Sequence, residues 1–378
     1  MADNRFDDIR PYYDSEIPAA MQRIAEYPML TAVSEWLFPG RPVSVLREQI
    51  RSITSTAQLH SQVMYPIIQQ IIKRSMTQFT YSGAEHLLTN KGMLFVSNHR
   101  DIVLDSFLQQ LVIYENRFPV AEISFGSNLM KSQFFVDLGK SNKMYRVERK
   151  SEDLRKFLKD SIHLSEYIRH LLTEGESIWI AQRNGRTKDG NDLTDKGLLK
   201  MFSMSGSKDS VASFEALHIV PVAISYELEP CDLFKAREVY LSRNGKKYNK
   251  APGEDEHSII TGIMQPKGHV HIHLCKAVSG EDLVPFAHMS GTDFLIALAD
   301  LIDERIYSGY KLYGTNFAAH DKLHGSERFA AKYTTDDLRF LDERLQQLYR
   351  LTDHEDDILT SIFLGIYANP VDNCFQEP

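Results

Sequence analysis

The hydrophobic pattern of the chain changes near residue 80. Before this point, apolar residues recur at three- and four-residue spacing, which is typical of helices with one buried face. The pattern predicts helices over residues 17–27 and 43–76, and Pro66 should kink or interrupt the second. Residues 1–80 are therefore expected to form an N-terminal helical segment. The flank of its long helix is basic, which would suit a membrane interface, but packing of this helix on the domain is the preferred interpretation.

From about residue 81 to 285, short apolar runs alternate with helical patterns. The predicted strands cover residues 93–97, 120–125, 143–147, 177–181, 217–225 and 267–275. The predicted helices cover residues 105–115, 127–136, 150–173 and 194–203. This alternation predicts an α/β domain with a mostly parallel central sheet flanked by helices, and function at the carboxyl ends of the strands.

Two further segments complete the predicted organisation. Residues 228–268 form a charged insertion between the last two strands, which we expect to be a lid or a substrate-facing loop. Residues 286–378 return to a helical pattern, with helices expected at 293–307 and 335–349. They are predicted to form a C-terminal helical extension.

Charge and composition narrow the classes of partner. The chain has 378 residues and a formal net charge of -8, which argues against nucleic acid as a partner. Residues 131–156 are locally basic and suit an anionic ligand, an anionic lipid head group or a solvated helix face. Its three cysteines form no disulfide framework, which favours a reducing cytoplasm. No signal peptide or membrane-spanning helix is expected, so work on lipids would occur from the membrane surface.

A histidine stands at the end of the first predicted buried strand. Asn98 and His99 follow the apolar run, and Asp101 and Asp105 come two and six residues after the histidine. An imidazole titrates near neutrality, and a carboxylate can fix its tautomer and stabilise its protonated form. The pattern fits an acid/base pair, and it also fits a helix N-terminus that Asp105 caps.

A second polar cluster, residues 182–191, follows the strand at 177–181. Gly185 and Gly190 allow tight turns, while Arg183, Arg186 and Lys188 supply donors. Guanidinium groups and free backbone amides beyond a strand end suit a phosphate group. An ordinary polar turn is the alternative.

Four motif blocks together resemble the glycerolipid acyltransferase superfamily, which includes glycerol-3-phosphate and lysophosphatidic acid acyltransferases. The blocks lie at Asn98-His99, at residues 143–149 (KMYRVER), at residues 184–187 (NGRT) and at residues 219–223 (IVPVA). The resemblance implies that His99 is a general base oriented by Asp105, with Asp101 as the alternative. It also implies substrate- or anion-binding roles for Arg100, Arg149, Arg146, Asn184, Gly185, Arg186, Thr187 and Lys188, and we favour Arg149 over Arg146 as the arginine of the second block.

The resemblance further implies the reaction and its partners. A fatty acyl group would move from acyl-acyl carrier protein or acyl-CoA to the hydroxyl of a glycerol phosphate or lysophospholipid, without a metal or other cofactor. The protein would be cytoplasmic and peripheral to the inner membrane. An N-acyltransferase that forms an amino-acid-containing lipid and a non-catalytic lipid- or carrier-binding protein are the alternatives.

The chain departs from the family pattern at two positions. The family has an aspartate five residues after its histidine, where this chain has Leu104, so Asp105 comes one residue late. The third block has Asn184 where the family has a glutamate, and an amide cannot supply that charge.

Two groups of histidines lie outside the blocks. The alternating triplet His269, His271 and His273 is interpreted as the polar face of a strand rather than a zinc site. His320 and His324 are interpreted as surface residues at the end of a helix. The sequence therefore predicts no metal ligands.

Overall fold

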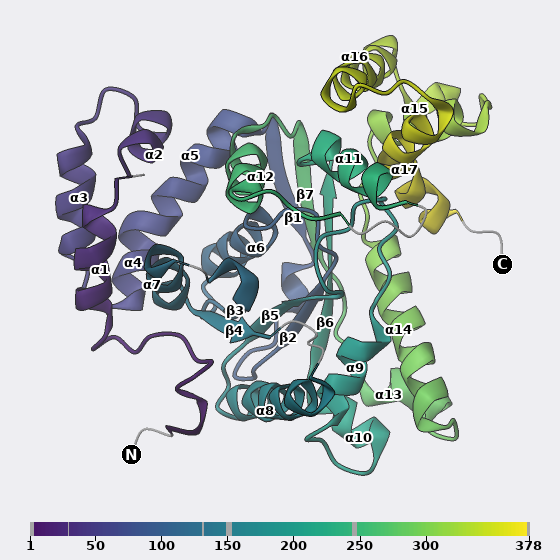
Figure 1. Ribbon diagram of the computed structural model, residues 1–378. Coiled ribbons are helices and arrows are strands. Elements are labelled where there is room, and N and C mark those ends of the chain that lie inside the picture. Colours follow the sequence, from purple (N-terminus) through teal and green to yellow (C-terminus); the bar gives the residue numbers. More distant parts are fainter. Residues whose placement is uncertain (1–3, 29, 131, 149–152, 244–247, 376–378) are drawn as a thin grey trace.

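The computed structural model in Figure 1 has a seven-stranded sheet at its centre and describes residues 4–28, 30–130, 132–148, 153–243 and 248–375. The strand order is β1-β7-β6-β2-β5-β3-β4. The strands are β1 (Gln78–Ser82), β2 (Leu94–Ser97), β3 (Glu122–Gly126), β4 (Met144–Val147), β5 (Ile178–Ala181), β6 (Ile219–Tyr226) and β7 (His269–Leu274). The five strands from β6 to β4 are parallel, whereas β7 is antiparallel to β6 and parallel to β1. The predicted α/β fold with a mostly parallel sheet is confirmed.

The strands that the sequence predicted are those with continuous apolar runs. All eight residues of β6 are buried, as are all four of β2, because helices cover both faces of the sheet. The strand that the sequence analysis missed is β1, which lies at the edge of the sheet and is partly exposed. Its residues, QFTYS, carry no apolar run, so only pairing with β7 reveals it.

Seven helices of the described residues lie on one side of the sheet. They are α1 (Ile17–Glu26), α2 (Leu30–Leu37), α3 (Val43–Arg51), α4 (Thr56–Leu59), α5 (Tyr65–Ser75), α6 (Leu104–Glu115) and α7 (Gln133–Ser141). Ile24 of α1 and Ile68 of α5 share one core with Phe95 of β2. The N-terminal helical segment therefore packs on the sheet rather than forming a core of its own.

The long helix predicted over residues 43–76 is wrong as a single element. It is divided into α3, α4 and α5, with a π-helical turn at His60–Met64. Pro66 lies in the first turn of α5, where its missing N–H costs no helical hydrogen bond. The break in the helix lies at residues 52–55, whereas at Pro66 the chain stays helical and only changes from a π-helical to an α-helical turn.

The other face of the sheet is covered by α8 (Leu154–Thr173), α9 (Lys196–Ser203), α10 (Ser210–Glu215), α13 (Gly280–Leu283) and α14 (Gly291–Ser308). Aspartates cap α8, α9 and α10, since each accepts backbone N–H groups of the first helical turn. Helix α14 packs on the same core as α8, so the predicted boundary at residue 286 does not separate it from the sheet.

The remaining helices lie beyond the carboxyl ends of the parallel strands (Figure 1). They are α11 (Asp232–Ser242), α12 (Glu254–Met264), α15 (Gly314–His324), α16 (Thr335–Thr352) and α17 (Asp357–Cys374). Helices α11, α15, α16 and α17 share a separate hydrophobic cluster. The insertion at 228–268, predicted as a lid or loop, contains α11 and α12 in its described part. Within the described ranges, no helix combines the length and the apolar character needed to cross a membrane.

Candidate active site

Two of the predicted motif segments meet at the carboxyl ends of β2 and β5. These strands are parallel neighbours, and Ser97 is aligned with Ala181 at their ends. The backbone N–H of Gln182 donates to the Ser97 carbonyl at 2.7 Å, and the backbone N–H of Thr187 donates to the His99 carbonyl at 2.8 Å. The sheet therefore holds the loop at 182–192 against the histidine.

His99 forms a pair with Asp105. His99 Nδ1 lies 2.9 Å from Asp105 Oδ2, and the side chain of His99 is 13% exposed whereas that of Asp105 is fully buried. Because a carboxylate accepts a hydrogen bond from Nδ1–H, the neutral imidazole presents an unprotonated Nε2. The imidazole edge also packs against Trp179, with the ring centroids 5.8 Å apart. The arrangement fixes one tautomer and one ring orientation.

Asp105 is held by three further hydrogen bonds. Its Oδ2 accepts from the backbone amides of Arg100 and Asp101 at 2.5 and 2.9 Å. Its Oδ1 accepts from the Tyr226 hydroxyl at 2.8 Å. Burial and the neighbouring Asp105 charge raise the pKa of Tyr226 well above its usual value, so Tyr226 remains a donor.

Asp101, the alternative partner predicted for His99, instead binds backbone amides at the start of α6. Its Oδ1 accepts hydrogen bonds from the amides of Val103 and Leu104, both at 2.9 Å, and so caps the start of α6. The extra residue in this turn brings Asp105, rather than Asp101, to His99. The one-residue offset from the family pattern is accommodated in this way.

A buried network of charges lies beneath the pair. Arg100 Nη2 contacts Asp192 Oδ2 at 2.6 Å, and Arg100 Nη1 contacts Glu229 Oε2 at 3.4 Å. Lys235 Nζ bridges Glu229 Oε1 and the Arg100 carbonyl, both at 2.6 Å. Burial opposes the charge of Arg100, but Asp192 and Glu229 raise its pKa well above the usual value. Burial likewise opposes the charge of Asp192, but Arg100 holds the pKa of that carboxyl below its usual value.

This network corrects the prediction that Arg100 binds the substrate anion. Its guanidinium is only 5% exposed and already neutralised by two carboxylates. Arg100 instead joins the histidine segment to the loop that carries Asp192. The sequence gives no cue for this, because a basic residue beside a catalytic motif looks the same whether it faces inward or outward.

The residues of the third-block loop, 182–192, differ in their surroundings. Thr187 is buried and donates to Asp192 Oδ1 at 2.5 Å, so it supports the loop. Lys188 Nζ pairs with Glu238 Oε1 at 2.5 Å. Asn184 is exposed, and Gly185 has a φ of 78° that favours glycine.

Arg186 is the residue of this loop with unused donor capacity. Its Nη1 is buried and has no hydrogen-bond partner among the residues that the structure describes. Its charge lies near Cys231 and opposes the effect of burial on the pKa of that thiol. A guanidinium N–H without a partner is a candidate contact for an anionic group.

The second block lies on the edge strand β4, which is separated from β2 by the strands β5 and β3. Arg146 is exposed within β4, and its Nη2 pairs with Glu148 Oε1 at 2.6 Å. The favoured arginine, Arg149, lies outside the described residues. The strands β2 and β4 run in the same direction, so this block ends at the same edge of the sheet as His99.

Several residues of the site were not identified from the sequence. Asp192, Tyr226, Glu229 and Tyr310 all contact the His99 segment or its supporting network. Gln182 is fully buried, and neither atom of its amide has a partner in the described parts of the chain. The polar cluster predicted at residues 182–191 includes Gln182, but no role was assigned to it.

The three alternating histidines lie on β7, as predicted. Thr80 Oγ1 is 2.8 Å from both His269 Nε2 and His271 Nδ1, and Ser82 Oγ is 3.0 Å from His271 Nε2 and 2.8 Å from His273 Nδ1. Burial lowers the pKa of His271 to about 4, which favours the neutral ring. The row is a hydrogen-bonded face between β1 and β7, in agreement with the sequence interpretation.

A mostly parallel sheet that carries an oriented histidine–carboxylate pair at its carboxyl edge defines an α/β protein with an acid/base site. Residues 78–225, which include this pair, match the family model described as Acyltransferase. The match covers the part of the chain that carries the sheet strands β1 to β6 and the histidine–carboxylate pair, and it supports acyltransferase activity.

The chain was also compared with solved structures and with curated proteins. Among solved structures, the chain is similar to the crystal structure of the 1-acyl-sn-glycerophosphate (LPA) acyltransferase PlsC from Thermotoga maritima. The two are 14% identical, the match covers 76% of this chain and 95% of that chain, and the TM-score is 0.34. None of the curated proteins matches the chain.

Proposed function

We propose that His99 is the general base that activates the acceptor of acyl transfer. The observation that carries this proposal is the contact between His99 Nδ1 and Asp105, which leaves Nε2 without a proton. Asp105 orients the ring and stabilises the imidazolium that forms during the reaction.

The reaction follows from ordinary acid/base chemistry. His99 Nε2 takes the proton of the acceptor hydroxyl as the oxygen attacks the carbonyl carbon of an acyl thioester. The carbon–sulfur bond then breaks, and the imidazolium returns its proton to the departing thiolate. The acceptor itself is the nucleophile, so the acyl group is never bonded to the protein.

The acceptor that we propose is the hydroxyl of a glycerol phosphate or a lysophospholipid. Arg186 Nη1, which has no hydrogen-bond partner among the described residues, supports an anionic group on the acceptor. We further propose that acyl-acyl carrier protein or acyl-CoA is the donor, and that the protein works from the cytoplasmic surface of the inner membrane.

The test uses the full chain with acyl-acyl carrier protein or acyl-CoA and three acceptors: glycerol 3-phosphate, lysophosphatidic acid and free amino acids. Transfer to a phosphate-bearing acceptor is expected, and His99→Ala should reduce kcat/KM by about 10²–10⁴-fold. His288→Ala is the matched control, because His288 is exposed and lies outside the site. Near-normal transfer by His99→Ala would contradict the role of His99, and transfer to amino acids alone would identify an N-acyltransferase.

A further inference from the structure

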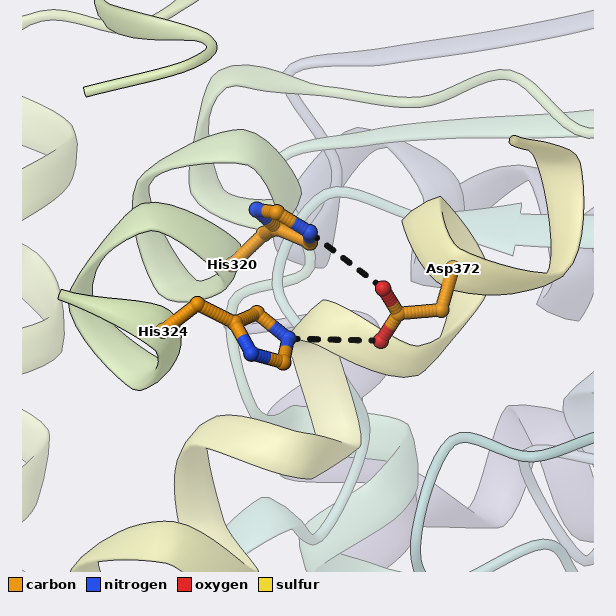
Figure 2. Close-up of side chains that lie close together, drawn as sticks. All are labelled: His320, His324 and Asp372. Atoms are coloured by element: carbon orange, nitrogen blue, oxygen red, sulfur yellow. Dashed lines mark ion pairs between the residues drawn. The ribbon is translucent and has the colours of Figure 1, made fainter. Parts of the chain in front are cut away.

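Three side chains from two helices converge far from His99 in sequence (Figure 2). His320 and His324 are one helical turn apart on α15, and Asp372 lies in the last turn of α17. One ligand atom from each lies within 4.8 Å of the other two. We propose that these three residues form a site for a divalent transition-metal ion, with zinc as the preferred occupant.

The distances between the side chains suit such an ion. His320 Nε2 is 3.2 Å from Asp372 Oδ1, and His324 Nε2 is 3.7 Å from Asp372 Oδ2. Tetrahedral zinc with bonds near 2.0–2.1 Å separates its ligand atoms by about 3.3 Å. Small rotations of the side chains would therefore bring all three onto one ion. Two histidines and one carboxylate leave the fourth position of a tetrahedral site open.

His320 is oriented in the way that metal-binding histidines usually are. The sequence interpretation as a surface residue is wrong for His320, because its side chain is only 8% exposed. Its Nδ1 lies 3.4 Å from Asp321 Oδ1, so a carboxylate stands behind the ring while Nε2 points to Asp372. Such a carboxylate behind the ring fixes the tautomer and raises the basicity of the ligating nitrogen.

The Asp321 carboxylate is itself held in place. It accepts from Ser326 Oγ at 2.7 Å and from the Phe329 amide at 2.8 Å. A carboxylate fixed in this way is the partner that a metal-bound imidazole needs on its other nitrogen.

Both ring nitrogens of His320 thus face carboxylate oxygens. A neutral imidazole has one N–H group, so only one of these two contacts can be a hydrogen bond. If Nδ1 donates to Asp321, the lone pair of Nε2 faces the lone pairs of the Asp372 carboxylate. A cation bound between Nε2 and Asp372 would make this second contact attractive. The competing explanation is that His320 carries a proton on both ring nitrogens. The cluster would then be an ion pair that needs no metal.

The position at two helix ends also favours a cation. Helices α15 and α17 end at His324 and Cys374, so both carboxyl ends lie beside the cluster. The unpaired carbonyls of a helix end carry partial negative charge. A bound ion would fasten the end of α17 to α15. Helix α17 also contacts the third-block loop, because Asn369 Nδ2 donates to the Asp189 carbonyl at 2.6 Å. An ion that joins α17 to α15 would therefore also affect this loop.

The test is zinc binding by the full chain without a histidine tag. The protein is stripped with a chelator and equilibrated with zinc alone, and bound zinc and the unfolding temperature are then measured. One zinc per chain and an unfolding temperature that rises with zinc concentration are expected. Loss of the zinc-induced rise after re-addition of chelator is expected as well.

Two variants separate the metal site from an ion pair. His324→Ala removes a side chain that is 48% exposed, and Asp372→Asn keeps the shape of the side chain. Both should still fold, and each should weaken zinc binding by at least about tenfold. The control is His288→Ala, which should bind zinc like the parent protein. Failure of the parent protein to bind zinc, or unchanged zinc binding in both variants, would overturn the proposal.

Discussion

Tyr226 of β6 donates a hydrogen bond to Asp105 of α6 over 2.8 Å, across 121 positions of the sequence. The bond fixes the carboxylate that contacts His99 Nδ1. Replacing Tyr226 by Phe removes this bond and little volume. A single hydrogen bond contributes about 1 kcal/mol, so we expect kcat to fall roughly fivefold with KM unchanged. Steady-state kinetics check this, and an equal change in KM alone would place Tyr226 in substrate binding instead.

Asp105 and Asp101 should differ sharply in their effect on catalysis. Asp105→Asn presents an amide to Nδ1 and favours the tautomer whose Nε2 already carries a proton. We expect kcat to fall by roughly 10³–10⁴-fold without loss of the fold. Asp101→Asn is the matched control, because an Asn oxygen also caps a helix. Equal loss in the two variants would refute the assignment of Asp105.

Arg100 should matter more for stability than an exposed arginine. Arg100→Met leaves Asp192 buried without its counter-charge, whereas Glu229 keeps Lys235, and we expect the free energy of unfolding to fall by about 3–5 kcal/mol. Arg339→Met provides the control, since Arg339 is 67% exposed in its pair with Asp336 and should change stability by about 1 kcal/mol or less. Urea denaturation measures both, and equal effects would show that the buried network contributes little.

Gly190 joins the third-block loop to α17. It has a φ of 78°, and a Cβ atom there would lie 2.3 Å from the Ile366 carbonyl oxygen. Gly190→Ala should therefore destabilise the protein by more than about 2 kcal/mol, which exceeds the cost of the left-handed backbone alone. Gly185→Ala has the same φ and no atom within 4 Å, so its cost should stay near about 1 kcal/mol. Urea denaturation of the two variants should reveal this difference, and similar values would mean that α17 moves aside easily.

Glu122 should make stability depend on pH. Burial raises the pKa of this carboxyl from 4.5 to about 7. Between these values the folded protein keeps a proton that the unfolded chain has lost, so its contribution to stability is complete below about pH 4.5 and declines as pH rises through 7. Glu122→Gln lacks this decline, and its stability relative to the parent should rise by up to about 3 kcal/mol between pH 5 and 8. Urea denaturation across this range checks the prediction, and a difference that does not vary with pH would contradict it.

The sequence by itself determined the elements with strong local signals. The apolar runs of β2, β5 and β6 predict strands because these segments are buried on both faces. His99 and Asp105 could be paired from the sequence because only six residues separate them and a strand leads directly into the turn. The edge strand β1 gave no such signal, because its residues are polar or partly exposed and depend on β7 for their hydrogen bonds.

The tertiary structure alone decided the contacts between distant segments. Whether Arg100 faces a substrate or Asp192 depends on how a loop 92 positions away folds back over it. The meeting of His320 with Asp372 depends in the same way on how α17 packs against α15. Burial, charge pairing and the approach of ligand atoms are properties of chain packing, and a local pattern along the sequence does not encode which distant residue will stand opposite.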